Sequence, residues 1–118
     1  MKKLFTLMLA LCGLLFITGC ADSPQDVAKK YTQALYDGDL AEANKYSTKK
    51  THAFNEIVIN ASKDKKSDKD KAKLKEALDS IDDSTEQIDG NTAKLISGKK
   101  TIAILQKVDG DWKVDVVK

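Results

Sequence analysis

The order of apolar and polar residues divides the chain into three parts. An apolar run from Leu4 to Ile17 comes first. Apolar residues then recur every three or four positions up to Asp83, which is the spacing of amphipathic helices. Beyond Asp83 the pattern alternates, and glycine-containing turn signals separate short β-prone runs. The sequence therefore predicts an α+β fold, with N-terminal helices packed on one face of a C-terminal antiparallel sheet.

The first amphipathic stretch predicts a helical hairpin with a tight corner. Ser23 is a typical N-cap, and Pro24 suits the first position of a helix. Gly38 is placed to end that helix in a left-handed conformation, and Asp39 then begins a second, short helix. The inward positions are Val27, Tyr31, Ala34 and Leu35 of the first helix, and Leu40, Ala43 and Tyr46 of the second.

The next segment, Thr51 to Ser62, fits two structures. A helix would place Phe54, Ile57, Val58 and Ala61 on one inward stripe, whereas Glu56 to Ile59 could equally form a short strand. Helix is the preferred prediction.

Lys63 to Lys75 is dense in charge, with seven lysines and three aspartates. The interspersed aspartates favour a solvated helix face or loop over a site for anionic headgroups or an acidic partner. A further helix should begin near Ser67 or Asp68, with Leu74, Ala77, Leu78 and Ile81 facing inward.

Turn signals at Gly90, Gly98 and Gly110 separate the predicted strands. The last hairpin allows two registers. A three-residue loop, Val108 to Gly110, would pair Ile104 with Val114, and it collects the larger apolar set on one face. A two-residue loop would pair Leu105 with Val114 instead. The first register is preferred. The predicted strands are Thr85–Ile88, Thr92–Ile96, Thr101–Lys107 and Trp112–Val117.

The N-terminal run has the layout of a secretory signal. A basic start precedes an apolar stretch that is too short for a membrane-spanning helix. The segment Ile17-Thr18-Gly19-Cys20 resembles the lipobox of bacterial lipoproteins. That resemblance implies lipidation of the Cys20 thiol and cleavage between Gly19 and Cys20. The alternatives are an ordinary cleaved signal or an uncleaved anchor.

The lipobox implies three segments: a removed signal peptide at 1–19, a lipidated tether at 20–23 and one domain at 24–118. Two or three acyl chains would hold the protein on the membrane far more firmly than a single chain does. In a Gram-negative cell, Ala21 after the cysteine would resemble outer-membrane sorting, with the domain on the periplasmic face. In a Gram-positive cell the anchor would be the outer leaflet of the single membrane.

Two segments resemble the small NTF2-like or cystatin-like lipoproteins, which are grouped as a domain of unknown function (DUF4878). The first is the helical hairpin within 27–43. The second is the closing hairpin at 105–114, in which a glycine turn precedes Trp112-Lys113. The resemblance implies a curved sheet wrapped around helices, often as a cone with a pocket. The candidate pocket-lining residues are Tyr31, Tyr46, Ile104, Trp112 and Val114.

Candidate chemistry is sparse. His52 is the only histidine and has no ligand-spaced neighbours, so a solvated surface residue is the preferred interpretation. An enzyme of this fold would need a carboxylate in the cone, and the candidates are Asp37 or Asp39 beside a tyrosine. Capping and turn roles explain both aspartates better. We therefore predict no catalytic residues, no metal and no cofactor.

Composition narrows the class of partner. All 20 basic residues are lysines, and they nearly balance 18 acids, so nucleic acid is not the predicted partner. Both cysteines, Cys12 and Cys20, precede the predicted domain. The sequence favours a lipid-anchored envelope protein that binds a protein partner or a small apolar ligand without catalysing a reaction. The alternatives are an isomerase- or hydrolase-like enzyme, and a phage- or plasmid-borne exclusion or immunity lipoprotein.

Overall fold

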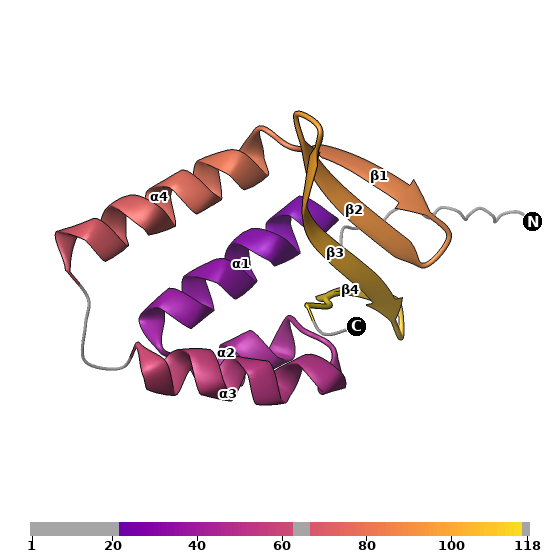
Figure 1. Cartoon of the computed structure of the whole chain (residues 1–118). Helices are drawn as coiled ribbons and strands as arrows, with labels where there is room; N and C mark the ends of the chain where they lie inside the picture. Colours follow the sequence, from indigo (N-terminus) through magenta and orange to yellow (C-terminus); the bar gives the residue numbers. More distant parts are fainter. Residues whose placement is uncertain (1–21, 63–66, 117–118) are drawn as a thin grey trace, which may run out of the picture.

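The computed structural model describes residues 22–62 and 67–116, which form four α-helices followed by a four-stranded antiparallel sheet (Figure 1). This architecture confirms the predicted α+β class. The helices are α1 (Pro24–Asp37), α2 (Leu40–Lys45), α3 (His52–Ala61) and α4 (Asp68–Asp82), with a 3-10 turn at Lys49–Thr51 before α3. The strands are β1 (Thr85–Asp89), β2 (Thr92–Ser97), β3 (Lys100–Val108) and β4 (Asp111–Val114), and they lie in sequence order.

The predicted helix starts are confirmed by their capping hydrogen bonds. The Ser23 hydroxyl accepts a hydrogen bond from the Asp26 amide at 3.2 Å, and Pro24 occupies the first helical position. Gly38 ends α1 at a φ of 74°, a left-handed conformation that glycine adopts without steric cost. Ser67 begins α4 with a complete capping box. Local sequence alone thus determines where these helices begin and end.

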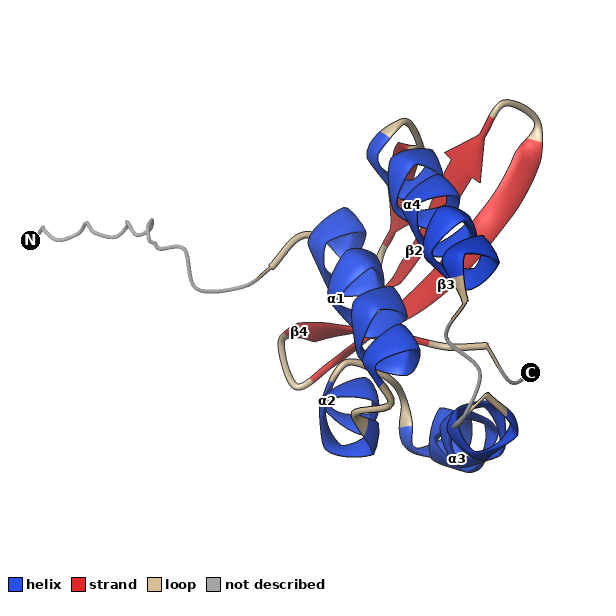
Figure 2. Cartoon of the chain, turned by 90° about the vertical axis from the view of Figure 1, so that its left-hand side faces the viewer, coloured by secondary structure: helices blue, strands red, loops and turns tan. Residues whose placement is uncertain are grey.

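Helix α1 lies at the centre of the molecule, with α4 on one side of it and α2 on the other (Figures 1 and 2). One face of α1 packs on β2, β3 and β4, and this contact holds the hydrophobic core. The two largest fully buried apolar side chains are Leu95 and Leu105, both from the sheet. The core residues contributed by the helices are Val27, Ala28, Tyr31, Ala34, Ala43, Ile59 and Ile81.

The helix predicted over 51–62 exists, but its predicted inward face is wrong. Asn55 and Ile59 of α3 face the core, whereas Phe54 is 39% exposed and Ile57 is 67% exposed. The spacing of apolar residues predicts a stripe through Phe54 and Ile57. The buried face of α3 instead contains the polar side chain of Asn55. The apolar stripe therefore lies partly in solvent.

The preferred register of the last hairpin is also wrong. Leu105 pairs with Val114 and Lys107 pairs with Trp112, as the two-residue loop requires. Asp109 and Gly110 both have positive φ values, 52° and 87°, which suits the twist of a two-residue hairpin turn. This register buries Leu105 rather than Ile104. Strand β4 also ends at Val114, before the predicted end at Val117, which lies outside the described residues.

A buried polar cluster joins α1, α2 and α3. The Tyr31 hydroxyl donates to Asn55 Oδ1 at 2.5 Å. The amide nitrogen of Asn55 donates to Asn44 Oδ1 at 3.0 Å and to the Ser47 hydroxyl at 2.9 Å. Asn55 has no exposed surface, so these three bonds replace the water that its side chain loses on folding. They favour the rotation of α3 that turns Asn55 toward α1 and α2.

A second polar contact fastens the α4–β1 corner to the start of α1. The Gln25 side chain donates to the Ile81 carbonyl at 3.0 Å and to the Ser84 carbonyl at 2.8 Å. The Gln25 backbone amide donates to Glu86 Oε2 at 3.1 Å. The two side-chain bonds add a donor to carbonyls at the α4–β1 corner, and the Glu86 carboxylate accepts from an amide in the first turn of α1, which has no partner within the helix. They hold α4 beside α1 at one end.

Replacing the central residue of the buried cluster should destabilise the fold strongly. We expect Asn55→Ala to lower the free energy of unfolding by about 2–4 kcal/mol, because it leaves buried hydroxyl and amide groups without partners. Urea denaturation followed by circular dichroism measures the change. Asn60→Ala, on the exposed side of the same helix, is the matched control and should shift stability by less than about 0.5 kcal/mol. Equal effects of the two substitutions would contradict the role given to Asn55.

Candidate functional site

An apolar opening lies between α1 and α4, above the ends of β3 and β4. Its inner part has a volume of about 290 Å³. A β-bulge near Leu95 leaves Ile102 as an extra residue in β3, and both Ile102 and Ala103 pack toward the core beneath this opening. The residues lining this inner part are Ala28, Tyr31, Thr32, Ala77, Ser80, Ile81, Ile102, Ala103, Val114 and Val116.

A second hollow of about 260 Å³ continues the opening along the two helices. It shares Thr32 and Ala77 with the inner part, so the two form one surface, which we call the apolar groove. Its other lining residues are Tyr36, Ser62, Asp70, Lys73 and Leu74. The one carboxylate among them is Asp70, which accepts a hydrogen bond from the Ser67 amide in the capping box of α4. The groove is therefore mainly apolar, with polar groups at its outer end.

Tyr31 forms part of the inner wall of the groove and is only 5% exposed. Its ring lines the groove, while its hydroxyl is bonded to Asn55. Burial raises the pKa of Tyr31 to about 12, because a phenolate there would lose its hydration. Tyr31 is therefore neutral throughout the ordinary pH range and presents an apolar ring to the groove.

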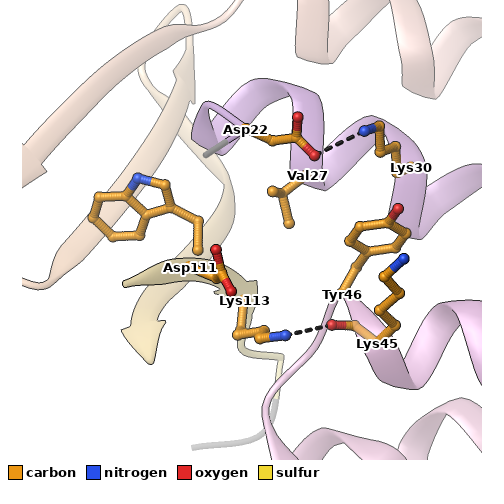
Figure 3. Close-up of a pocket in the computed structure, with 8 residues that line it drawn as sticks. Asp22, Val27, Lys30, Lys45, Tyr46, Asp111 and Lys113 are labelled. Carbon is orange, nitrogen blue, oxygen red and sulfur yellow. Dashed lines mark hydrogen bonds and ion pairs between the residues drawn. The ribbon is translucent and has the colours of Figure 1, made fainter. Parts of the chain in front are cut away.

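A separate polar pocket of about 290 Å³ lies on the other side of α1 (Figure 3). Asp22 and Lys30 form an ion pair at 2.7 Å across its upper edge. The Lys113 ammonium donates to the Lys45 carbonyl at 2.6 Å, which joins β4 to α2 at its lower edge. The ammonium groups of Lys30 and Lys45 lie 5.7 and 5.4 Å from the centre of the Tyr46 ring. The remaining lining residues are Val27, Asp111 and Trp112.

A broader hollow of about 680 Å³ adjoins this pocket and shares Lys45 and Lys113 with it. The 3-10 turn adds Lys49 and Lys50 to its rim. His52 lies at its edge, where its ring Nε2 donates to the Asn44 carbonyl at 3.0 Å. The other lining residues are Asn44, Ser47, Thr48 and Val108. The rim is cationic, and the floor consists largely of hydrocarbon stems.

The structure divides the five candidate pocket-lining residues among different places. Tyr31 and Val114 line the apolar groove, while Tyr46 and Trp112 line the polar pocket on the other side of α1. Ile104 lies in β3 opposite Lys94, on the sheet face away from Leu105, and lines none of these three surfaces. The sequence predicts that these five residues line one pocket, whereas in the structure they do not. Cys20 and Gly19 lie outside the described residues.

The aspartates considered for acid–base chemistry have structural partners. Asp39 caps α2, accepting from the Glu42 amide at 3.2 Å, as the sequence predicted. Asp37 is exposed at the end of α1 and accepts from the Gln33 side chain at 3.0 Å. His52, predicted as a solvated surface residue, is half-buried at the start of α3. None of these three residues lines the apolar groove.

Sequence reasoning missed Asn55 and the gathering of lysines around the broader hollow. Asn55 lies one position from the apolar residue Phe54, and only the rotation of α3 shows which of the two is buried. Lys45, Lys49 and Lys113 come from α2, the 3-10 turn and β4. Because these segments lie far apart in the sequence, no pattern within one segment predicts that they border the same hollow.

Comparison with protein-family models, with curated proteins and with solved structures finds no match to this chain. Within 22–62 and 67–116 there is no helix with the length and apolar character needed to cross a bilayer. The same residues contain no group of three or more metal-ligating side chains close enough together to hold an ion. The resemblance to NTF2-like lipoproteins stays a prediction.

The raised pKa of Tyr31 predicts a loss of stability at high pH. Below pH 10 the tyrosine is neutral in both the folded and the unfolded chain. As pH rises from 10 to about 12, the unfolded chain loses the proton first, so the folded state loses about 2–3 kcal/mol of relative stability. Urea denaturation at successive pH values should show this fall in the wild type. Tyr31→Phe should lack this component, and an identical pH dependence in both proteins would contradict the assignment.

Proposed function

We propose that this chain is a lipid-anchored bacterial envelope protein whose single domain is a non-enzymatic binding module. Its site is the apolar groove, and its ligand is a small apolar molecule or an apolar segment of a protein partner. The observation that carries this proposal is the groove itself, which exposes apolar side chains of α1, α4 and the sheet. The finer classification as an NTF2-like or cystatin-like domain belongs to the same proposal, supported by helices that precede and pack on an antiparallel sheet.

The proposed anchor is supported by the position of the lipobox relative to the first helix. Ser23 caps α1, and only Ala21 and Asp22 separate it from Cys20. Two or three acyl chains on Cys20 would place this folded domain directly against the headgroup layer. In a Gram-negative cell we place it at the outer membrane, on the periplasmic side.

The groove supports a binding role because two polar groups in its lining already have partners within the fold. The Tyr31 hydroxyl is bonded to Asn55, and Asp70 is bonded within its own capping box. What remains facing the opening is the ring of Tyr31, alanines 28, 77 and 103, and the branched side chains of Ile102 and Val114. An apolar guest would bury this surface and gain roughly 25 cal/mol for each Å² removed from water.

The groove does not favour the enzyme alternative. An acid–base mechanism of that kind needs a carboxylate beside the bound substrate, held at a suitable pKa. No acidic residue lines the inner part of the groove, and the carboxylate nearest Tyr46, that of Asp22, is paired with Lys30. The apolar side chains that line the groove suit the binding of an apolar ligand instead.

Replacing the lipobox cysteine tests the anchor. We expect Cys20→Ser to abolish signal cleavage and lipidation, because the serine hydroxyl is a far weaker nucleophile than the thiol. Intact-mass analysis of the wild-type protein should show the acyl mass on a chain that begins at Cys20. A Cys20→Ser chain that is still processed and still resists extraction from the membrane would refute lipidation. Cys12→Ser lies within the same signal and serves as the control, since its processing should be normal.

Photocrosslinking from the groove tests the binding role. Ala77 lines both parts of the groove, whereas Ala72 of the same helix is exposed. A photoreactive diazirine side chain at position 77, activated in intact cells, should give several-fold more adduct than one at position 72. A small mass increase would identify an apolar ligand, and a crosslinked band would identify a protein segment.

The crosslink must depend on the groove to support the proposal. Thr32→Trp places a bulky side chain where the two parts of the groove meet and should remove the adduct from position 77. Circular dichroism of this variant checks that the fold is retained. Equal adduct yields from positions 77 and 72, or a yield unchanged by Thr32→Trp in a folded protein, would contradict the proposed site.

A further inference from the structure

We infer that a second surface of this domain, opposite the apolar groove, contacts anionic phospholipid headgroups of the membrane that holds the chain. We call it the lysine face and define it by three side chains, Lys45, Lys49 and Lys113. This inference rests on the proposed anchor and adds the orientation of the domain and the class of lipid that it recognises. The face is distinct from the lysine-rich segment 63–75 that dominates the sequence.

The lysine face is assembled from three segments of the chain around two adjoining hollows. Lys45 of α2 and Lys113 of β4 line both the polar pocket and the broader hollow. Lys49 of the 3-10 turn lines the broader hollow. Lys50 of the same turn also lines this hollow, but its ammonium is paired with Asp115 at 3.4 Å. Lys45, Lys49 and Lys113 therefore border one contiguous surface.

This surface carries charge that the domain itself does not neutralise. Among the described residues, no carboxylate lies within 4 Å of any of the three ammonium groups. Two of the nearby acids have other partners, since Asp22 pairs with Lys30 at 2.7 Å and Asp115 pairs with Lys50 at 3.4 Å. Asp111 also lines the polar pocket and offsets only part of the positive charge. A set of unpaired cations on one side of a protein attracts an anionic surface, and the attraction weakens with salt.

The tether fixes which side of the domain meets the membrane. Asp22 lines the polar pocket, so the chain enters the domain beside the lysine face. Cys20 is two residues from Asp22, a reach of at most about 7 Å. A lipidated Cys20 therefore brings the headgroups to this side.

The hollows offer the chemistry that a phospholipid headgroup needs. The broader hollow has a volume of about 680 Å³, with ammonium groups at the rim and the apolar side chain of Val108 in its wall. A headgroup phosphate accepts hydrogen bonds from lysine ammonium groups, and the lipid hydrocarbon near it favours apolar contact. Tyr46 and Trp112 in the adjoining pocket belong to the amphipathic residue types that concentrate at membrane interfaces.

Helix α4 provides an internal comparison. Its lysines alternate with aspartates and a glutamate, and Lys75 pairs with Asp79 at 3.2 Å. It also lies on the opposite side of α1 from α2, away from the tether (Figure 1). Lysine density in the sequence therefore does not locate the membrane-facing surface.

Amine labelling of the purified lipidated protein in vesicles tests the inference. The protein is reconstituted into vesicles of phosphatidylcholine alone and into vesicles that also contain phosphatidylglycerol, and acetylation of each lysine is measured by mass spectrometry. We expect Lys45, Lys49 and Lys113, together with Lys50 on the rim of the same hollow, to be labelled several-fold more slowly with phosphatidylglycerol, and the protection to fade at high salt. Lys69 and Lys71 of α4 should be labelled equally in both. Equal labelling of the lysine face in both lipids would overturn the inference.

A charge-matched pair of variants separates the face from general electrostatics. Lys45→Gln, Lys49→Gln and Lys113→Gln combined should remove the lipid-dependent protection of Lys50, which lines the same hollow. The combination of Lys69→Gln, Lys71→Gln and Lys73→Gln has the same net charge and should retain it. Retention of the protection in both triple variants, or its loss in both, would contradict a site at these residues.

The anchor and the lysine face fail in different ways. If intact-mass analysis shows no acyl group, the proposed anchor is wrong, and the same labelling is then made on the unlipidated chain mixed with each vesicle. Protection of the lysine face by phosphatidylglycerol would still support the face. If the acyl group is present and no protection appears, the anchor stands and the face is refuted.

Discussion

The fold depends on one buried asparagine more than on any single apolar contact. Asn55 has no exposed surface and binds partners in α1, in α2 and in the segment after α2. An apolar core tolerates small rotations of a helix, whereas three directed hydrogen bonds do not. They set α3 in the one rotation that leaves its Phe54 and Ile57 outside, and they turn the Tyr31 ring toward the groove. The position of the groove wall thus follows from a polar contact behind it.

The local features of this fold were predictable from the sequence, and the features that join distant segments were not. Ser23, Gly38 and Ser67 mark helix ends because caps use short-range hydrogen bonds and backbone preferences. The buried face of α3 depends on Tyr31 and Asn44, which lie in other helices. The register of the last hairpin depends on how Leu105 fits beneath α1. The spacing of apolar residues within one segment therefore predicts neither the buried face of α3 nor the register of this hairpin.

The candidate site was predicted only in part, for the same reason. Tyr31 and Val114 were chosen as inward residues and do line the groove, while Tyr46 and Trp112 line a pocket on the far side of α1. A pattern of inward positions predicts that a residue is buried, but it does not predict on which side of α1 the residue lies. The lysine face shows the point most clearly, since 63–75 is the obvious cationic segment and the unpaired charge gathers elsewhere. Which lysines lie close to the tether depends on the fold and not on their density in the sequence.

The short segment after α2 has a consequence for how the sheet ends. The Val114 amide donates to the Tyr46 carbonyl at 2.8 Å, and the Thr48 amide donates to the Val114 carbonyl at 2.9 Å, so β4 is hydrogen-bonded on both of its sides at this residue. The segment after α2 therefore covers the end of one border strand. Within the described chain, the other border strand is β1, where Glu86, Gln87 and Asp89 make the edge polar. The two borders of the sheet are thus protected against added strands by different means.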